Sequence, residues 1–259
     1  MPAGDLQSFA FTTTGEGFAG FSLTDTADPN KQKLQPGTYS VAETAQDGWT
    51  LTSATCTSTV ANKTQTIGKI NLEAGEHVTC TFTNTKKGTI TIEKRTIPAS
   101  SSASFAFSGD FIPDTVNKTI KDGEKIIISN LPLIDGAYII TEAPLDGWKL
   151  TELTCSDSEI STGNPRASVV NLENAEAQIF LDADESITCI FTSKQLTSVT
   201  GEKIWQDGEN PALRTAIELQ LLRKVKDSAD EPAPVPGLNP IKLDGTETQP
   251  WIHTWQNLD

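Results

Sequence analysis

The sequence predicts an all-β protein made of tandem immunoglobulin-like β-sandwich domains, the third of which is incomplete. Three observations carry this prediction: apolar and polar residues alternate over short segments, turn residues separate these segments, and a block of about 100 residues occurs twice. No long stretch has apolar residues at helical spacing. A chain of 259 residues is long enough for two or three such domains.

The duplication becomes visible when the sequence is aligned with itself. The matched segments are residues 9–11 with 105–107, 36–43 with 135–142, 47–49 with 146–148, and 78–83 with 187–192. The offset grows from 96 to 99 and then to 109, so roughly ten residues are inserted between the two cysteines of the second copy, in an expected loop. Because a solenoid unit has only about 20 to 45 residues, each copy is expected to fold as a separate domain.

Within each copy, one segment that ends in glutamate alternates strictly. In a strand, side chains two residues apart share a face, so we expect a carboxylate to point the same way as two buried neighbours. These sets are Tyr39, Val41 and Glu43 in the first copy and Tyr138, Ile140 and Glu142 in the second. Asp47-Gly48 and Asp146-Gly147 follow as turns that end the segment.

The pattern changes after Gln195. Residues 199–205 and 217–223 are expected to form strands of a third module, and the proline-rich residues 231–236 are interpreted as an exposed loop. The predicted domains are therefore residues 1–86, 87–196 and 197–259, the last being incomplete.

Charge and hydropathy exclude some classes of partner. The formal net charge of −14 argues against binding to nucleic acid, because a phosphate backbone requires clustered lysine and arginine. No run of eighteen apolar residues occurs, so we expect no membrane span in this chain. No signal peptide is visible at the start, and an export signal is expected outside this sequence.

The two copies resemble the prealbumin-like domains of bacterial surface proteins, which are related to SpaA-type pilin and Cna B-type collagen-adhesin modules. The residues that carry the resemblance are 36–43, 48–51, 56, 78–85 and 88–94. Through residues 199–205, 217–223 and 255–258 the tail resembles a Cna B-type domain. The resemblance implies an extracellular stalk or adhesin.

The four cysteines fall at equivalent positions, two in each copy. The repeat therefore predicts disulfides between Cys56 and Cys80 and between Cys155 and Cys189, each across its sandwich, in an oxidising compartment. The alternatives are reduced thiols in the cores and a shared zinc site. The zinc site lacks any Cys-x-x-Cys pair and would join two distant domains, so no metal is expected.

The family resemblance also implies a possible self-formed isopeptide bond between a first-strand lysine and a last-strand asparagine. This chemistry needs a neutral lysine in an apolar site and a protonated glutamate beside the amide. Each module has an incomplete set: Glu43 and Asn84 in the first, Lys94 and Glu142 in the second, and Lys203 in the third. At the position that matches Asn84, the second module has Ser193. The simpler interpretation is that the glutamates bond to neighbours and that Lys94 is ion-paired or solvated.

The lysine-bearing first strand of the first copy is expected upstream of residue 1. If that strand were truly absent, the sandwich would expose a strand edge that could pair with another chain.

Other candidate sites carry weaker signals. Trp49, Trp148 and Trp205 are expected to pack in cores or turns rather than to stack on sugars. Acidic groups at residues 25 and 28, and at 182, 184 and 185, lack the register of a calcium loop. His77 and His253 lie in different modules without a recognisable nucleophile motif, so no catalytic residue and no cofactor is expected.

The leading functional hypothesis is a non-catalytic structural stalk or spacer of a secreted or surface-anchored bacterial protein, in contact with other surface-protein domains. The alternative is an adhesive module that binds a host matrix protein or a glycan through loops at one end of a sandwich. Its candidate site is the longer segment between the cysteines of the second copy, residues 156–186.

Overall fold

A computed structural model describes residues 5–157, 167–208, 210–246 and 250–259. Within this part the chain consists of strands and turns, with one short 3-10 helix at Pro211–Leu213. Two compact units are present, Met1–Pro144 with Leu150–Ser193, and Leu145–Lys149 with Lys194–Asp259. The prediction of an all-β chain with tandem sandwiches is confirmed, whereas the three predicted domain boundaries stay a prediction.

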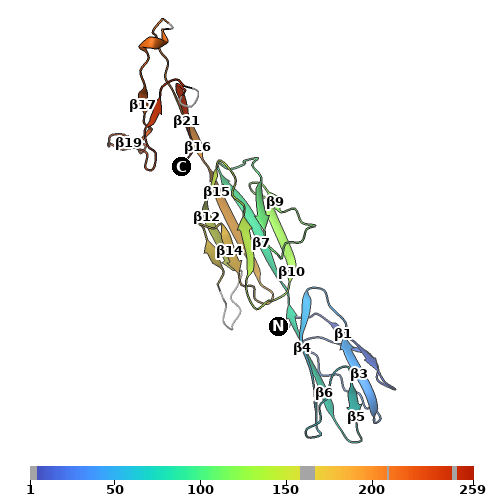
Figure 1. The fold of residues 1–259 in the computed structure, drawn as a ribbon. Helices are drawn as coiled ribbons and strands as arrows, with labels where there is room; N and C mark the ends of the chain where they lie inside the picture. Colours follow the sequence, from blue (N-terminus) through green and yellow to red (C-terminus); the bar gives the residue numbers. More distant parts are fainter. Residues whose placement is uncertain (1–4, 158–166, 209, 247–249) are drawn as a thin grey trace. The chain divides into compact units, whose positions relative to one another are not determined.

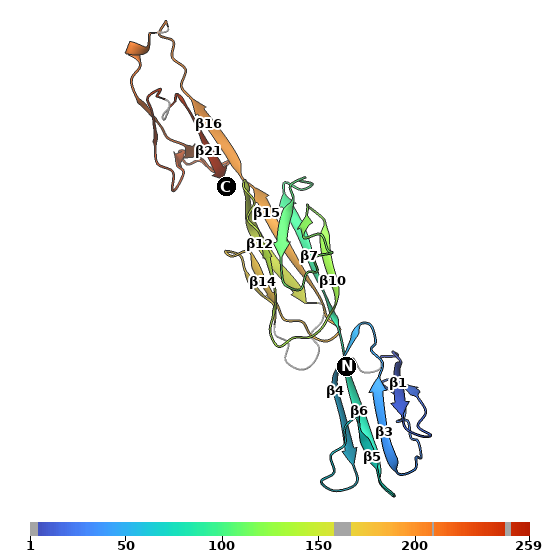
Figure 2. The same cartoon turned by 45° about the vertical axis from the view of Figure 1, so that its right-hand side comes forward.

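The first sandwich has one sheet of four strands and one of two. The four-stranded sheet has the order β2 (Phe21–Leu23), β1 (Phe9–Thr14), β3 (Gly37–Glu43) and β5 (Ile70–Leu72). The other sheet pairs β4 (Trp49–Ser58) with β6 (Val78–Lys86) in antiparallel fashion. Both ribbon views show these two sheets as separate layers (Figures 1 and 2).

Alternating apolar residues fill the space between these two layers. Phe9 and Phe11 are buried on β1, while Ala10 between them is exposed. The ring of Phe9 meets that of Trp49 edge-on at 5.3 Å between centroids, and Phe11 meets Phe82 of the other sheet at 4.9 Å. Trp49 is therefore a core residue, as its position after the Asp-Gly turn predicts.

The second sandwich contains two larger sheets. One has the order β10 (Lys125–Leu131), β7 (Gly88–Ile97), β15 (Ser186–Gln195) and β12 (Trp148–Asp157). The other has the order β13 (Val169–Asn171), β14 (Glu176–Ile179), β11 (Tyr138–Glu142), β8 (Phe105–Ser108) and β9 (Thr119–Ile120).

Strand pairing shows where the two copies differ. Tyr39 pairs with Ile70 of β5, and Tyr138 pairs with Ile179 of β14, so β5 and β14 are counterparts. The insertion of the second copy therefore precedes β14. The expectation that it lies in a loop stays a prediction, because residues 158–166 of this segment lie outside the described part; β13 extends the sheet beside β14.

Matched Asp-Gly turns enter β4 and β12. Gly48 and Gly147 have φ of 78° and 75°, a left-handed conformation that glycine adopts without a Cβ penalty. The amide of Trp49 donates to the carbonyl of Gln46 at 3.2 Å, and that of Trp148 to the carbonyl of Leu145 at 3.1 Å. Trp49 after the first turn is buried, whereas Trp148 after the second turn is half-buried.

Three two-stranded sheets are formed by the described residues of the second unit. They pair β16 (Thr197–Glu202) with β21 (Ile252–Leu258), β17 (Ile217–Leu219) with β20 (Ile241–Leu243), and β18 (Leu222–Arg223) with β19 (Ala233–Pro234). The single strand expected at residues 217–223 is thus two strands, and the proline-rich loop contributes β19. A proline can occupy so short and exposed a strand, because its missing N–H faces no partner at the edge.

Within this unit, Leu243 and Trp255 are the buried hydrophobic residues among those described. No helix in the described part of the chain is long and apolar enough to cross a bilayer.

Candidate functional site

Two disulfides are present, and they join the pairs that the repeat predicts. Cys56 on β4 is bonded to Cys80 on β6, and Cys155 on β12 is bonded to Cys189 on β15. Each bridge has a Cα–Cα distance of 4.0 Å, and Cys56 lies directly opposite Cys80 in the antiparallel register. The expectation of a bridge across each sandwich is therefore wrong, because each bridge links neighbouring strands of one sheet.

These bridges close loops of 24 and 34 residues in sequence separation. By restricting the unfolded chain, each contributes about 3 to 4 kcal/mol to the stability of its sandwich. Both bridges tie down the last strand of a sandwich, β6 or β15.

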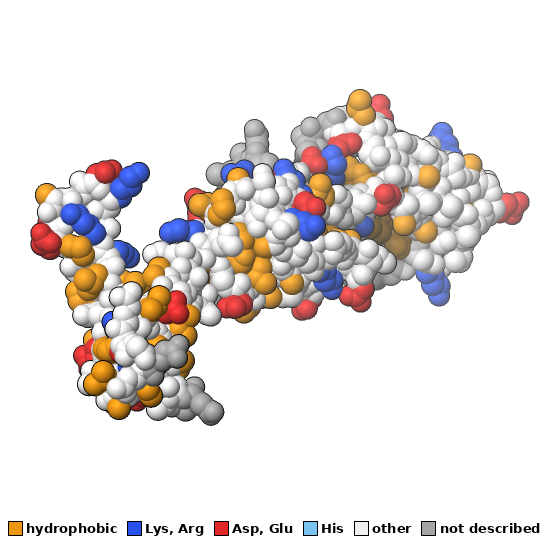
Figure 3. Space-filling view, turned by 90° about the horizontal axis from the view of Figure 1, so that it is seen from above, with side chains coloured by type: hydrophobic (Ala, Val, Ile, Leu, Met, Phe, Trp, Pro, Cys, Tyr) orange, Lys and Arg blue, Asp and Glu red, His pale blue; other side chains and the backbone are white. Residues whose placement is uncertain are grey.

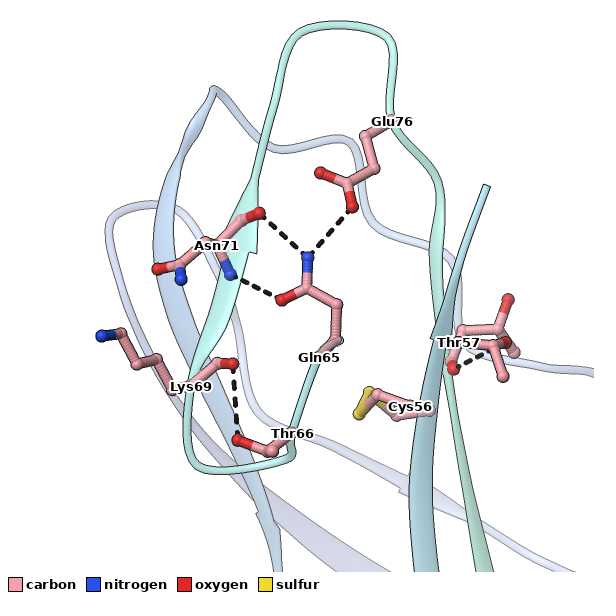
Figure 4. Close-up of a disulfide and its surroundings, with 9 residues drawn as sticks. Cys56, Thr57, Gln65, Thr66, Lys69, Asn71 and Glu76 are labelled. Atoms are coloured by element: carbon pink, nitrogen blue, oxygen red, sulfur yellow. Dashed lines mark hydrogen bonds between the residues drawn. A yellow bond between two sulfur atoms is a disulfide. The ribbon is translucent and has the colours of Figure 1, made fainter. Parts of the chain in front are cut away.

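A polar network lies beside the first disulfide and connects the strands near it (Figure 4). Gln65 reaches between Asn71 and Glu76: its Nε2 donates to the Asn71 carbonyl and to Glu76 Oε1, both at 3.0 Å. Its Oε1 accepts from the Asn71 amide at 3.0 Å. The Gln65 side chain thereby fixes the loop that carries β5 against the start of β6.

Glu76 is the acceptor at the centre of this network. Its carboxylate accepts from Ser58 Oγ at 2.5 Å, from Lys63 Nζ at 2.7 Å and from the Glu73 amide at 2.8 Å. The hydrogen bond from Lys63, followed by that from Ser58, lowers the pKa of Glu76 to about 2. Glu76 therefore stays ionised over the physiological range.

Sequence reasoning missed this hub, although the repeat contains a signal for it. Glu185 is the counterpart of Glu76 at the last offset, and it is also buried. Its carboxylate accepts from the Asp182 amide at 2.8 Å, as Glu76 accepts from Glu73. Asp182 and Glu185 are thus hydrogen-bonded to each other within a turn. This structural role explains why two acidic residues occur three positions apart, and it requires no calcium ion.

The second sandwich contains a buried lysine with two polar partners. Lys94 on β7 donates to Glu142 of β11 at 2.9 Å (Oε1) and 2.8 Å (Oε2). It also donates to Ser193 Oγ of β15 at 2.6 Å, and Ser193 donates to Glu142 Oε1 at 3.1 Å. The three side chains form a closed triangle that joins both sheets.

Burial defines the electrostatics of this triangle. Lys94, Ser193 and Glu142 are 0%, 1% and 6% exposed, and the Lys94 ammonium lies 4.0 Å from the centroid of the Phe105 ring. Loss of hydration lowers the pKa of Lys94, and the hydrogen bonds that its ammonium donates to Glu142 oppose this shift. The site thus supplies the nucleophile and the carboxyl group of an isopeptide-forming set, but Ser193 offers a hydroxyl in place of an acyl carbon.

The other candidate residues for an isopeptide bond lie in the first and third modules. They are Glu43 and Asn84 in the first and Lys203 in the third. Asn84 Nδ2 donates to Glu43 Oε2 at 2.9 Å, and among the described residues no ion pair joins Glu43 to a lysine. The Lys203 ammonium lies 4.6 Å from the centroid of a Trp205 ring. Within the part of the chain that is described, none of these three sets is completed to a lysine, a glutamate and an asparagine in contact.

A metal site requires several ligating side chains that lie close together. No group of three or more histidine, cysteine, aspartate and glutamate side chains among them is placed to hold a metal ion. Acidic and basic side chains are interspersed over the described residues that are visible in Figure 3. Residues 158–166 of the candidate adhesive segment lie outside the described part.

Known proteins resemble this chain in sequence and in fold. The family described as prealbumin-like fold domain matches residues 2–86 and 90–195, which is well over half of the chain. No curated protein matches.

Three solved structures are among those to which the chain is similar. The major pilin of Streptococcus pyogenes is 17% identical, with 73% of this chain and 91% of that chain covered and a TM-score of 0.33. An adhesin of Mobiluncus mulieris that contains disulfide, isopeptide and ester cross-links is 14% identical, with coverages of 73% and 85% and a TM-score of 0.34. A C-terminal fragment of the pilus adhesin SpaC of Lactobacillus rhamnosus GG is 15% identical, with coverages of 73% and 89% and a TM-score of 0.27.

Proposed function

The chain belongs to the family of prealbumin-like fold domains, and on this premise we propose that it is a non-catalytic structural stalk or spacer of a secreted or surface-anchored bacterial protein. In this role, sandwiches connected in series hold another domain away from the cell and resist unfolding.

The position of the disulfides relative to the connections carries this proposal. Only Lys87 separates the last strand of the first sandwich, β6, from the first strand of the second, β7. Only Leu196 separates β15 from β16. A pull along the chain therefore acts on strands that are each covalently tied to a neighbour through Cys80 or Cys189.

The same bridges support an extracellular location, because disulfides persist in oxidising compartments and are rare in the cytosol of mesophiles. No cysteine is left unpaired in either sandwich.

One observation favours the second candidate, an adhesive module. Strand β13 lies at the edge of its sheet, and Val169, Val170 and Leu172 in this region are 54%, 41% and 45% exposed. Exposed apolar side chains on a strand edge are a common feature of binding surfaces. An array of host matrix proteins and glycans tests this candidate, with Val169→Ser/Val170→Ser as the variant that should lose any saturable binding.

Heat denaturation with and without a reductant tests the stalk proposal. Loss of about 3 to 4 kcal/mol from each sandwich should lower its melting temperature by ten degrees or more, since about 1 kcal/mol shifts a domain of this size by roughly 4 to 8 °C. A melting curve that reduction leaves unchanged, once free thiols are verified by labelling, would remove the main support for this function.

A further inference from the structure

The two single-residue connections between strands of successive modules are held by the same backbone contact. The amide of Lys87, between β6 and β7, donates to the carbonyl of Gly48 at 2.8 Å. The amide of Leu196, between β15 and β16, donates to the carbonyl of Gly147, also at 2.8 Å. Each Asp-Gly turn thus accepts a hydrogen bond from the residue that connects its own sandwich to the next module.

The aspartate of each turn is bound by an asparagine of the following module. In the first compact unit, Asn130 Nδ2 donates to Asp47 Oδ1 at 3.2 Å and to Oδ2 at 3.4 Å. In the second unit, Asn257 Nδ2 donates to Asp146 Oδ1 at 3.5 Å. The Asn130 side chain lies against its turn, because its Oδ1 would be only 3.6 Å from a Cβ added at Gly48.

Both asparagines are presented by the same local backbone structure. Asn130 and Asn257 have φ of 60° and 54°, a left-handed conformation that asparagine adopts more readily than most residues with a side chain. Each is followed by a leucine that pairs with the first residue of a connecting strand, Leu131 with that of β7 and Leu258 with that of β16. The register shifts beside both pairs, as in a β-bulge. The asparagine therefore lies next to the connection in both modules.

Duplication of the sandwiches does not by itself account for this recurrence. The two turns are copies of each other, but the modules that donate the asparagine differ. Strand β10 is the edge of a four-stranded sheet, whereas β21 pairs with β16 in a two-stranded sheet of the described residues. Two different modules thus present the same residue, in the same conformation, to the same kind of turn.

We propose that each Asp-Gly turn is a docking site for the Asn-Leu bulge of the module that follows it. The glycine carbonyl binds the amide of the connecting residue, and the aspartate carboxylate binds the asparagine. Asparagine suits this site because it combines an N–H donor with tolerance of the left-handed conformation. Two contacts at separate points limit rotation about the connection, which a single hydrogen bond would not do.

This inference concerns the connections and makes no use of the disulfides. Its failure would leave the effect of reduction on the melting temperature unchanged, and failure of the stalk proposal would leave the docking contacts in place. The two are therefore tested separately.

Hydrogen exchange of the Lys87 and Leu196 amides, followed by NMR on the whole chain, tests the docking sites. Asn130→Gly keeps the left-handed backbone and removes only the carboxamide. It should make the Lys87 amide exchange about three- to tenfold faster, as expected for loss of one exposed hydrogen bond to a charged group, and should leave the Leu196 amide unchanged. Asn257→Gly should have the opposite selectivity.

A matched control is available in the first sandwich. Asn62 is exposed, lies in another turn and has φ of 59°, so Asn62→Gly makes the same chemical change away from both docking sites. It should alter neither connecting amide. Protection of amides in β4 and β7 verifies that both sandwiches stay folded in every variant. A folded Asn130→Gly variant with unchanged exchange at Lys87 would overturn the proposal.

A double-variant comparison shows whether the two side chains act as a pair. Because Asp47→Ala and Asn130→Gly remove the same contact, the combined variant should exchange the Lys87 amide no faster than the faster single variant. Multiplied effects would refute the pairing. Backbone ¹⁵N relaxation should also show the two sandwiches tumbling more independently in Asn130→Gly, and unchanged tumbling would refute the claim that the contact limits rotation.

Discussion

The buried contact between Lys94 and Glu142 offers a quantitative prediction. In Lys94→Met, Glu142 keeps only the Ser193 hydroxyl among its bonds in the triangle, while its side chain stays 6% exposed. Removal of one partner from a buried ion pair leaves an uncompensated charge, so we expect the free energy of unfolding of the second sandwich to fall by about 3 to 5 kcal/mol. Glu142→Leu should have a comparable effect, moderated by the ability of Lys94 to lose its proton.

The double variant Lys94→Met/Glu142→Leu should be more stable than either single variant. It replaces both charges with apolar groups, and its main remaining cost is the Ser193 hydroxyl, about 1 to 3 kcal/mol for a buried polar group without partners. The expected coupling between the two positions, which is the sum of the two single losses minus the loss of the double variant, is therefore at least about 3 kcal/mol.

Urea denaturation followed by pulsed hydrogen exchange measures this coupling on the whole chain. Amides of β7 and β15 report the second sandwich, while those of β4 and β6 serve as an internal control that should not change. A double variant whose loss equals the sum of the two single losses would refute the view that these groups act as a pair.

Two further predictions concern other parts of the sites. The pKa of Glu76 lies below its ordinary value of 4.5, at about 2, so its stabilising effect is complete above pH 4.5 and is lost as the pH falls toward 2. Acid titration of stability should show this loss in the first sandwich, and Glu76→Gln should remove it, whereas Glu73→Gln, at an exposed carboxylate bonded to the same Lys63, should largely retain it. Ser193→Asn places a carboxamide beside Lys94, whose neutral amine can attack the side-chain carbonyl and form an amide as ammonia leaves. The intact mass should then be one ammonia below the value calculated from the sequence of the variant. The control Ser193→Ala should show its calculated mass. A folded Ser193→Asn variant that also shows its calculated mass would contradict this prediction.

The repeat made the disulfides and the inward glutamates accessible from sequence. Because each cysteine and each glutamate recurs at a matched position, the pairing of Cys56 with Cys80 and the inward direction of Glu142 follow from alternation. The sequence could not show whether each disulfide joins two strands of one sheet or two strands in facing sheets. The spacing of the cysteines along the chain is compatible with both arrangements.

Other features depended on tertiary context. In the sequence, Ser193 is recognisable only as a missing asparagine, because a lone serine on a strand carries no sign that a buried lysine will face it. The segment before β14 has no strong strand pattern, and β13 forms there because β14 offers it an edge. Residues 217–223 alternate throughout, yet they divide into β17 and β18, which pair with two different short strands.

Single-molecule stretching of the whole chain tests the central claim that internal disulfides limit how far each sandwich can extend. The bridges withhold 24 and 34 residues from extension. At roughly 3.4 Å per residue, reduction should lengthen the unfolding steps of the two sandwiches by about 80 Å and about 115 Å. Steps of equal length before and after reduction would show that the bridges do not shield the chain from force, in contradiction to a role as a disulfide-clamped spacer.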